Sequence, residues 1–399
     1  MAVITDEKRI DEVLDRGVIV NILPTKEDFR KLLMSGKRMK IYIGFDATAS
    51  TLHLSHAKNI MLLEDFRKLG HEVVLLFGDF TARIGDPSDQ IGTRSMLSKE
   101  QALKNIEDWK TQINNLIDFK NKENPVDIAL NGEWLAKLNL EEVLDLASNV
   151  TVQQMIERDM FQKRIKEGKH IFLHEFLYPL MQGYDSVSLE VDAELCGTDQ
   201  TFNALMGRTL LRKIKNKEKF VVTVNLMENP KTGELMSKSK GTGVFLNTTP
   251  SEMYGGIMSQ SDDMTKVFFV NCTRVPLEEI NTILQKDNPL DAKKIVAKEI
   301  VKIIHGEKDA DEAEINWANT FQKGEVPEEM TEVKIEEEET LMVVLVKEKI
   351  VSSNGDFRRL INEGAITNLE NDEKITDAAY IPEKGIRLRI GKKRFVKIV

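Results

Sequence analysis

Cysteine is scarce in this chain, and long apolar runs are absent. Only Cys196 and Cys272 occur among 399 residues, which is too few for a disulfide framework and typical of a reducing compartment, although the two thiols could pair. No stretch approaches the ~18 consecutive apolar residues that a membrane span requires. The first eight residues lack the basic-then-apolar pattern of a secretory signal. We therefore expect a globular, cytoplasmic protein with no membrane segment.

A basic excess is also missing, because 56 Lys and Arg stand against 65 Asp and Glu, a net charge of -9. Non-specific affinity for nucleic acid comes mainly from phosphate neutralisation by Lys and Arg, so the chain is not expected to coat nucleic acid indiscriminately. Residues 385–399 differ, since their basic side chains alternate with apolar ones and no acidic residue interrupts them. This pattern predicts strands with one basic face, which is either an RNA contact or an edge strand protected by charge.

The length and the apolar pattern predict about two or three domains. Residues 40–224 alternate short apolar runs with longer helical patterns, which is typical of an α/β domain with a mostly parallel sheet. Helical periodicity near 126–164 indicates an insertion whose apolar residues are either a homodimer interface or ordinary core. The predicted order is a catalytic domain at 1–247, a helical domain at 248–324, an acidic linker at 325–340 and a small module at 341–399.

Two short runs, His53-Leu54-Ser55-His56 and Met236-Ser237-Lys238-Ser239-Lys240, carry side chains suited to a nucleotide's phosphates. The first run follows an apolar strand pattern at 40–46 and begins a helical pattern that Gly70 ends. A strand, helix, strand unit places the helix start at the carboxyl edge of a parallel sheet, where phosphates bind. Taken alone, the histidines could instead ligate a metal or cap the helix, and the lysines could be a solvated loop.

Six motifs in this order and spacing resemble those of bacterial tyrosyl-tRNA synthetases, a family of class I aminoacyl-tRNA synthetases. They are Tyr42-Ile43-Gly44-Phe45-Asp46-Ala47-Thr48, His53-Leu54-Ser55-His56, Ile84-Gly85-Asp86-Pro87-Ser88, Tyr178-Pro179-Leu180-Met181-Gln182-Gly183-Tyr184-Asp185, Gly197-Thr198-Asp199-Gln200 and Met236-Ser237-Lys238-Ser239. The resemblance covers nearly the whole chain. It implies a Rossmann-like parallel-sheet catalytic domain, a helical anticodon-side domain and a small α+β C-terminal RNA-binding domain.

The resemblance also implies an activity, namely the ligation of L-tyrosine to tRNA(Tyr) through tyrosyl-adenylate. ATP would be a substrate accompanied by Mg²⁺, with no metal site of the protein's own, and the enzyme would be a homodimer. The catalytic residues would be Thr48, His53, His56 and Lys238. The other ATP-binding residues would be Gly44, Asp46, Ser55, Gly197, Asp199, Met236, Ser237 and Ser239.

Two further sets of residues follow from the same resemblance. Tyrosine would be bound by Tyr42, Asp86, Tyr178, Gln182, Asp185 and Gln200, with the phenol between Tyr42 and Asp185. RNA would be bound by Arg358, Arg359, Arg387, Arg389, Lys392, Lys393 and Arg394. Three positions depart from the family's usual residues: Ser55 and Cys196 replace glycine, and Leu235 replaces lysine.

Two other functions compete with an active tyrosine ligase. Ser55 and Leu235 would suit an RNA-interaction protein that has lost catalysis, but the retained Gln182, Asp185 and Lys238 argue against that. Specificity for tryptophan is the second alternative, because an indole N–H can donate to a carboxylate. The pairing of Tyr42 with Asp185 favours a phenol, since a hydroxyl both donates and accepts.

Overall fold

The computed structural model describes residues 2–85, 97–236, 243–285, 288–322, 330–336, 339–348, 350–371, 373–391 and 394–399. The chain divides into two compact units, Met1–Ala310 and Asp311–Val399, which are described separately. Asp86, Ser237, Lys238, Ser239, Lys240, Lys392 and Lys393 lie outside the described residues. Within the described ranges, no helix is both long and apolar enough to span a membrane.

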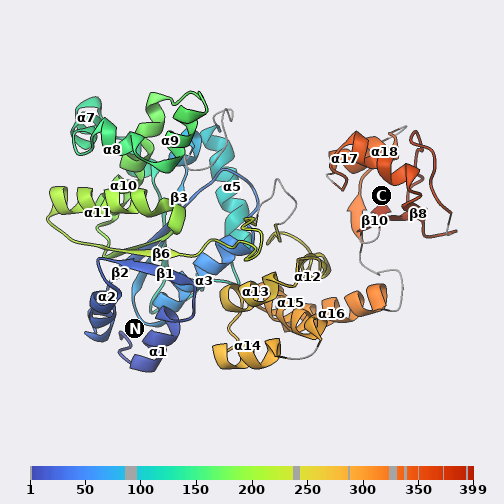
Figure 1. Cartoon of the computed structure of the whole chain (residues 1–399), viewed down its shortest axis with the longest axis horizontal. Coiled ribbons are helices and arrows are strands. Elements are labelled where there is room, and N and C mark those ends of the chain that lie inside the picture. The colour runs from blue at the N-terminus through green and yellow to red at the C-terminus, as the bar shows by residue number, and fades with distance from the viewer. Residues whose placement is uncertain are drawn as a thin grey trace. The chain divides into compact units, whose positions relative to one another are not determined.

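The first unit is built on a six-stranded sheet with the order β1-β6-β5-β2-β3-β4 (Figure 1). Neighbouring strands are parallel except at β1, which is antiparallel to β6. The expected parallel α/β sheet is therefore confirmed. The strands are β1 Ile19–Leu23, β2 Lys40–Asp46, β3 Glu72–Gly78, β4 Val126–Leu130, β5 Ala193–Gly197 and β6 Phe220–Val224.

Helices cover both faces of this sheet. Helix α3 packs on β2 and β3, whereas α11 packs on β5 and β6, and α10 packs closely against α11. Figure 1 shows α10 and α11 on one side of the strands and α2 and α3 on the other. The helices up to α11 are α1 Glu7–Leu14, α2 Lys26–Met34, α3 Leu54–Lys68, α4 Thr81–Ile84, α5 Lys99–Gln112, α6 Gly132–Leu135, α7 Leu140–Ala147, α8 Val152–Ile156, α9 Asp159–Lys166, α10 Tyr178–Leu189 and α11 Thr201–Lys215, with short 3-10 turns η1 Leu173–Phe176 and η2 Thr198–Gln200.

Helix α3 begins and ends where the sequence predicts. The side chain of His53 caps its first turn, and the helix ends before Gly70. Gly70 has a φ of +94°, and a Cβ atom there would lie 2.5 Å from the carbonyl oxygen of Ala2. Both the backbone conformation and the close approach of the N-terminal segment therefore require glycine.

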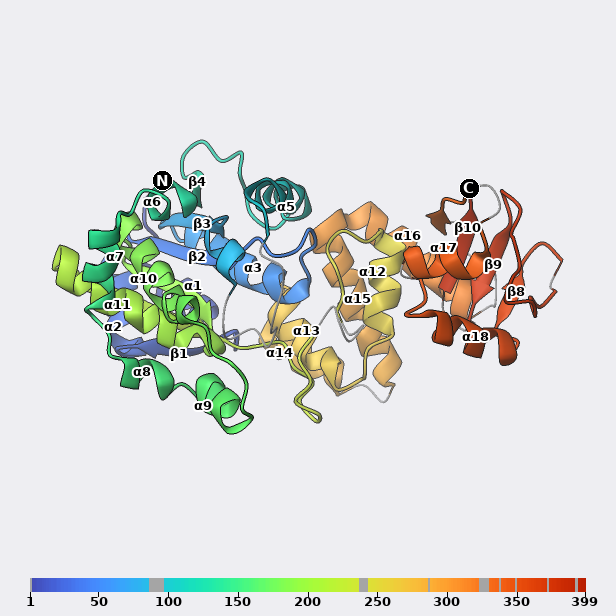
Figure 2. The same cartoon turned by 90° about the horizontal axis from the view of Figure 1, so that it is seen from above.

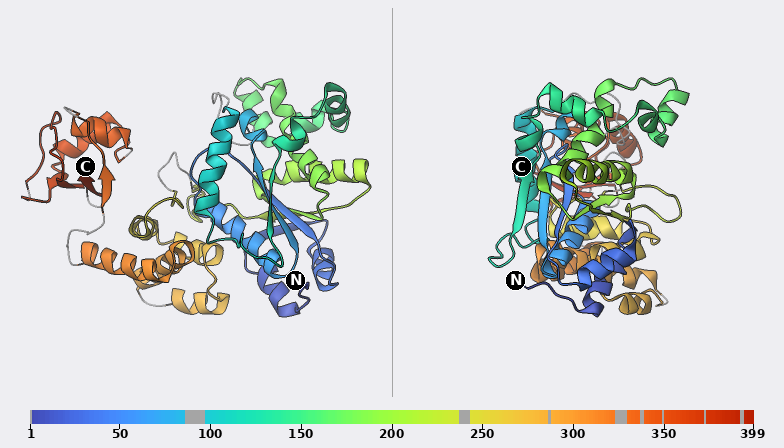
Figure 3. Two further views of the ribbon diagram at one scale, coloured as in Figure 1. Left: turned by 180° about the vertical axis from the view of Figure 1, so that it is seen from behind. Right: turned by 90° about the vertical axis from the view of Figure 1, so that its left-hand side faces the viewer.

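The predicted insertion near 126–164 starts differently from the prediction. Residues Val126–Leu130 form β4, an edge strand of the main sheet, and helices α6 to α9 follow it. An edge strand buries little, so its pattern of apolar residues is weak and the following helical pattern hides it. Leu146 and Met155 of the insertion share an apolar cluster with residues of α10 and α11. Figure 3 shows the green helices of the insertion beyond α10 and α11, away from the sheet.

A helical group follows the sheet, as the sequence predicts, and belongs to the same compact unit up to Ala310. It comprises α12 Pro250–Met258, α13 Met264–Cys272, α14 Leu277–Leu284 and α15 Pro289–His305, while α16 Glu307–Gln322 crosses the boundary between the units. Figure 2 shows α12 to α15 gathered beside α3. The guanidinium of Arg16 binds this group by donating to the carbonyls of Phe269, Val270, Thr273 and Val275 at the end of α13.

The second unit is an α+β module. Its sheet has the order β7-β10-β9-β8, and α17 and α18 pack with it around a common apolar core. Its elements are β7 Thr331–Val333, α17 Leu341–Lys347, α18 Asn354–Asn362, β8 Ile366–Asn368, β9 Arg387–Ile390 and β10 Arg394–Ile398. The predicted basic strands are thus confirmed as β9 and β10.

Part of the predicted acidic linker belongs to this second unit. Strand β7 pairs in parallel with β10, and Val333 is fully buried in the core. Strand β7 has only one acidic residue, Glu332, which is exposed beside the buried Val333. The acidic composition of the whole stretch therefore concealed this short strand. The prediction of a linker over all of 325–340 is wrong for residues 331–333.

Candidate active site

Several of the described residues predicted for the site lie at the carboxyl ends of β2 and β5. Strand β2 has β3 on one side and β5 on the other. The chain adds β3 and β4 on one side of β2 and then adds β5 and β6 on the opposite side. Such a switch point opens a crevice that binds ligands in doubly wound sheets. Gly44 and Asp46 end β2, while Gly197 ends β5 and Asp199 follows it.

Two glycines leave room for carboxylates at this edge. A Cβ atom on Gly197 would lie 2.3 Å from Oδ1 of Asp199. A Cβ atom on Gly78, at the end of β3, would lie 2.1 Å from Oδ1 of Asp46. Sequence reasoning found Gly197 through its motif but missed Gly78, whose only signal is a glycine at the end of an apolar strand.

The two histidines form a reciprocal cap at the start of α3. The backbone N–H of Ser55 donates to Nδ1 of His53, and the backbone N–H of His53 donates to Nδ1 of His56, both at 3.3 Å. Helix capping, one of the alternatives left open, is therefore confirmed. Because each Nδ1 accepts a hydrogen bond, each neutral ring carries its proton on Nε2 and can donate from there.

Burial keeps both imidazoles neutral. It lowers the pKa of His53 to about 4 and holds the pKa of His56 well below its ordinary value, with the neighbouring His53 as a second cause. The ring centroids are 4.1 Å apart. The histidine pair therefore offers hydrogen-bond donors without charge at neutral pH, and cations for phosphates have to come from elsewhere.

Residues 231–236, which precede the lysine motif, contact the segment after β6 and the residue before α13. Met236 is buried, and its N–H donates to the carbonyl of Met227. The ammonium of Lys231, which could have replaced the lysine missing at Leu235, lies 2.8 Å from Oδ1 of Asp263. Asp263 directly precedes α13, and Lys231 is exposed.

Tyr42 and Asp185 are both buried, at 1% and 2% exposure. The indole Nε1 of Trp134 donates to Oδ1 of Asp185 at 2.8 Å, and the amide of Asn131 donates to Oδ2 at 3.3 Å. Burial raises the pKa of Asp185 well above its ordinary value, and these two hydrogen bonds oppose the rise. Burial, with the charges of Glu194 and Asp185, likewise raises the pKa of Tyr42, so that residue keeps its hydroxyl proton.

Sequence reasoning missed Asn131 and Trp134 as partners of Asp185. Asn131 directly follows β4, and Trp134 lies in the short helix α6. A polar residue at the carboxyl end of a parallel strand was the available signal, but the strand itself had not been recognised. Trp134 lies in the stretch 126–164, where the sequence shows only helical periodicity.

The remaining predicted tyrosine contacts form hydrogen-bonded chains. The hydroxyl of Tyr178 donates to Oδ2 of Asp46 at 2.9 Å, which links a tyrosine-site residue to an ATP-site residue. The amide of Asn203 donates to the side-chain oxygens of Gln182 and Gln200, at 2.9 and 2.8 Å. Gln200 in turn donates to Oδ2 of Asp199 at 3.2 Å. The structure thus brings these predicted residues together through shared partners.

Cys196 lies on β5 but points into an apolar cluster with Ala204 and Val221. Both cysteines are free and buried. Among the described residues, no group of three or more His, Cys, Asp or Glu side chains is arranged to hold a metal ion.

The predicted RNA-binding residues lie in the second unit and differ in how they are paired. Arg359 contacts Asp356 and Glu363, and Arg387 contacts Glu370. Arg394 donates to a backbone carbonyl. Within the described part of the second unit, neither Arg358 nor Arg389 has an ion-pair partner.

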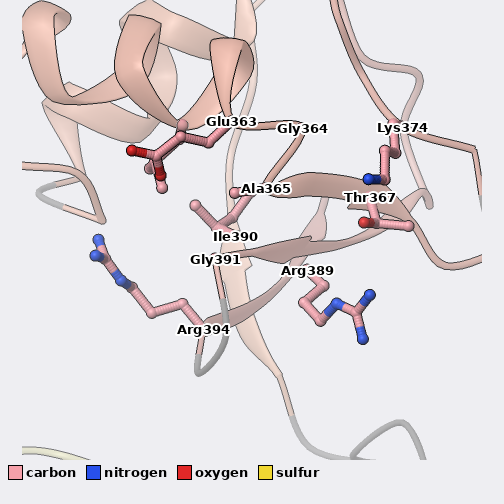
Figure 4. Close-up of a pocket in the computed structure, with 10 residues that line it drawn as sticks. Glu363, Gly364, Ala365, Thr367, Lys374, Arg389, Ile390, Gly391 and Arg394 are labelled. Carbon is pink, nitrogen blue, oxygen red and sulfur yellow. The ribbon is translucent and has the colours of Figure 1, made fainter.

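Arg389 borders a hollow of about 700 Å³, which Lys374 and Arg394 also line. Figure 4 shows the guanidinium of Arg389 extending away from α18, whereas that of Arg394 extends toward it.

Comparisons with known proteins agree with the sequence motifs. Residues 34–322 match the family model of class I tRNA synthetases for tryptophan and tyrosine. The chain is 41% identical to a tyrosine-tRNA ligase of Carboxydothermus hydrogenoformans over 98% of each chain, and 39% identical to one of Thermotoga maritima over 99% of this chain and 98% of that one.

Solved structures share the fold. The C-terminally truncated mitochondrial tyrosyl-tRNA synthetase of Aspergillus nidulans matches with a TM-score of 0.67 at 23% identity, covering 78% of this chain and 94% of that one. The tyrosyl-tRNA synthetase of Archaeoglobus fulgidus, complexed with L-tyrosine, matches with a TM-score of 0.60 at 18% identity, covering 77% of this chain and all of that one.

The neutrality of the histidine pair can be tested by NMR titration of the imidazole carbons. We expect the His53 and His56 signals to stay constant from pH 8 to 5.5, because their pKa values lie below the ordinary value of about 6.5. His53→Gln and His56→Gln variants assign the two signals. Since the unfolded chain takes up protons first, the stability contributed by neutral burial falls as the pH drops from 6.5 toward 4. A titration of either ring near pH 6.5 would contradict this.

Proposed function

This chain belongs to the class I tyrosyl-tRNA synthetases, and we propose that the crevice at the carboxyl ends of β2 and β5 is where its reaction takes place. The enzyme is an ATP-dependent tyrosine-tRNA ligase, which activates L-tyrosine as tyrosyl-adenylate and transfers it to the 3′ end of tRNA(Tyr). The tryptophan alternative is set aside because the relatives that match nearly full length are tyrosine ligases.

The buried carboxylate of Asp185 is the observation that carries the site assignment. Removing the charge of a carboxylate from water is costly, so a buried carboxylate normally has hydrogen-bond donors or a ligand around it. Trp134 and Asn131 donate to it, yet a carboxylate has about four acceptor positions. We assign a remaining position to the phenolic O–H of tyrosine, with the Tyr42 hydroxyl as the second partner of that phenol.

The other end of the amino acid would meet Tyr178 and Gln182. Tyr178, Gln182 and Asp185 all belong to α10. One helix would therefore contact tyrosine at both its ammonium end and its phenol end. Gln182 would accept from the ammonium group, with Gln200 near the carboxylate. Asp86 completes this set in the proposal and lies outside the described residues.

ATP would lie across the start of α3. Thr48 and the Nε2 donors of His53 and His56 would bind its phosphates, and Gly197 and Asp199 its ribose, with Gly44, Asp46, Ser55 and Met236 lining the site. We propose that Mg²⁺ arrives as part of the nucleotide substrate. Because the histidines are neutral, the cationic partner of the departing pyrophosphate would be Lys238, in the segment with Ser237 and Ser239.

The reaction requires no nucleophile from the enzyme, because the substrate supplies one. The enzyme's main task is to position the reactants. The carboxylate of tyrosine attacks the α-phosphate, and negative charge moves onto pyrophosphate. Holding the reactants in line lowers the barrier, as do donors aimed at the developing charge. Neutral imidazoles that are already fixed by the reciprocal cap need no reorganisation during that step.

We further propose a cytoplasmic homodimer. Several large apolar side chains of the insertion and of the adjoining segment are exposed, and together they would form a patch suited to a second copy of this chain. They are Leu140, Leu144, Val152, Ile165, Phe172 and Leu173, with exposed fractions of 49% to 79%.

The second unit is proposed to bind tRNA through phosphate contacts. Arg358 and Arg389 would contribute most, because Arg359 and Arg387 already neutralise acidic neighbours. Arg394, Lys392 and Lys393 would add further contacts, and the two lysines lie outside the described residues. A domain boundary near 247 and the helical domain at 248–324 as the anticodon side also remain part of the proposal.

The tyrosine pocket is tested by Asp185→Asn and Tyr42→Phe. Each should lower kcat/KM for tyrosine in ATP–pyrophosphate exchange, by about 10- to 100-fold for Asp185→Asn and about 2- to 10-fold for Tyr42→Phe, because a charged acceptor is worth more than a neutral hydroxyl. Tyr254→Phe, in another buried tyrosine, is the matched control. Since the ionised carboxylate accepts the phenol, kcat/KM should also fall as the pH drops through the raised pKa of Asp185. Unchanged kinetics in both variants would contradict the pocket.

The dimer is tested by Leu140→Glu combined with Leu144→Glu on α7. The charges should dissociate the dimer, halving the mass seen by light scattering at micromolar concentration. Val20→Glu places a charge on an apolar residue of β1 that is also exposed, at 58%, and should leave the mass unchanged. A monomeric mass for the unmodified chain would refute the proposal.

The tRNA surface is tested by Arg389→Ala and Arg358→Ala. Each should raise KM for tRNA in aminoacylation and reduce the salt dependence of tRNA binding by about one counterion, while pyrophosphate exchange stays unchanged. Arg387→Ala, which removes an arginine already paired with Glu370, should have a smaller effect. Equal loss of exchange and aminoacylation in Arg389→Ala would contradict the assignment.

A further inference from the structure

A buried ion pair, formed by residues that are not among those proposed to bind tyrosine, lies next to that proposed pocket. Lys219, just before β6, and Glu194, on β5, are 1% and 2% exposed, and the Lys219 ammonium contacts Oε2 of Glu194 directly. A buried pair of this kind is weak support for stability, because desolvation of both charges offsets their attraction. Its neighbours indicate another use.

The first neighbour is Gln182, at the ammonium end of the pocket. Its side-chain Nε2 donates to Oε1 of Glu194 at 3.1 Å. A carboxylate can only accept, so Glu194 fixes which end of the amide is nitrogen. The oxygen of Gln182, which accepts from Asn203, is thereby kept as an acceptor and retains a lone pair for the substrate's ammonium group.

The second neighbour is Ser186, at the phenol end. Its hydroxyl oxygen accepts from the Lys219 ammonium at 2.6 Å and lies 3.0 Å from the Tyr42 hydroxyl. The alternative acceptor for the Ser186 proton, Oε2 of Glu194, is farther away at 3.4 Å. That distance exceeds the usual range for an O–H···O bond, so the proton of Ser186 is better directed to Tyr42.

The surrounding helices leave space for this arrangement. A Cβ atom on Gly207 of α11 would lie 2.6 Å from the Lys219 nitrogen and 2.7 Å from the Ser186 oxygen. The Lys219 ammonium also lies 5.7 Å from the ring centroid of Tyr42, within the range of a cation–π contact. Lys219 and Ser186 therefore pack directly against Gly207, and a larger residue at that position would displace them.

We infer that Lys219, Glu194 and Ser186 are positioning residues that direct the Tyr42 hydroxyl proton toward the substrate. Lys219 donates to Ser186, Ser186 donates to Tyr42, and Tyr42 donates to the phenolic oxygen of tyrosine, which donates to Asp185. Each hydroxyl accepts one proton and passes on its own. This inference rests on the proposed tyrosine pocket and adds a source of discrimination against phenylalanine.

The discrimination follows from the direction of the chain. Phenylalanine has no hydroxyl, so the Tyr42 proton would face an apolar ring and Asp185 would lose a donor. Ser186 favours this direction, because its oxygen receives the Lys219 ammonium and lies nearer to the Tyr42 hydroxyl, at 3.0 Å, than to Oε2 of Glu194, at 3.4 Å. Unpaired buried groups of this kind are the physical basis of strong rejection.

A double-mutant cycle tests the chain through Ser186. Ser186→Ala keeps the ion pair and should lower kcat/KM for tyrosine about 2- to 10-fold in pyrophosphate exchange, mainly through KM, while kcat/KM for phenylalanine stays the same. In Tyr42→Phe, adding Ser186→Ala should have no further effect on the tyrosine-to-phenylalanine ratio. Independent, multiplicative effects of the two substitutions on that ratio would overturn the inference.

Glu194→Gln tests the ion pair, with Glu64→Gln as its matched control. Glu64 forms a similarly buried pair with Arg67, with 6% and 5% exposed side chains, elsewhere in the same unit. Both variants should lower the midpoint of urea unfolding, but only Glu194→Gln should raise KM for tyrosine while leaving KM for ATP unchanged. An equal change in KM for tyrosine in both, or none in Glu194→Gln, would overturn the role of Glu194.

The double variant Glu194→Leu/Lys219→Met covers the case in which Glu194→Gln does not fold, because it removes both charges together. It should reproduce the reduced tyrosine-to-phenylalanine ratio of Ser186→Ala, and a ratio equal to that of the unmodified enzyme would overturn the inference. If Tyr42→Phe and Asp185→Asn leave tyrosine kinetics unchanged, the pocket itself is misassigned. If those two matter and the Ser186 and Glu194 variants do not, only the positioning chain fails.

Discussion

The reversal of strand succession between β2 and β5 is the constraint on which the rest of the first unit depends. Crossovers in parallel sheets are right-handed in almost all cases, so helices that lead in opposite directions from the middle of a sheet pass over opposite faces. The carboxyl ends of the two central strands are then left uncovered. Asp46 and Asp199, the start of α3 and the start of α10 all come to that edge.

Polar groups at this edge are held by neighbours before any substrate binds. The histidines cap one another, Trp134 and Asn131 hold Asp185, and Asn203 connects Gln182 with Gln200. Each of these contacts reduces the freedom of a side chain in the proposed site, which lowers the entropic cost of ordering it when a substrate binds. Burial contributes in the same direction, because it keeps the imidazoles neutral and the Tyr42 hydroxyl protonated.

Charge is distributed unevenly between the two units. The chain as a whole carries -9, whereas β9 and β10 of the second unit are basic. Acidic neighbours pair with Arg359 and Arg387, which leaves a smaller set of arginines for the proposed phosphate contacts. A surface on which every arginine is unpaired would bind RNA without selection, and more tightly in low salt. The pairing of these two arginines with acidic residues therefore limits non-specific affinity for RNA.

Much of the local structure could be predicted from the sequence. Strands β2 and β3, helix α3 with its end at Gly70, the helices α14 and α15 and the basic strands β9 and β10 all follow patterns that are strong within one segment. Strands β4 and β7 were missed, because an edge strand buries one side or less and its pattern merges with its neighbours. The sequence motifs also identified the family and most residues proposed for the site.

Only the tertiary structure decided which buried neighbours contact the residues proposed for the site. Asn131, Trp134, Ser186, Glu194 and Lys219 come from four separate segments, and no spacing in the sequence connects them. Their roles arise from burial, which makes every donor require a particular acceptor. The sequence by itself determined the family and predicted which side chains bind tyrosine and ATP, because those residues lie in short contiguous motifs. Only the fold decided which of them are neutral and which neighbours hold them, because these properties depend on residues distant in the chain.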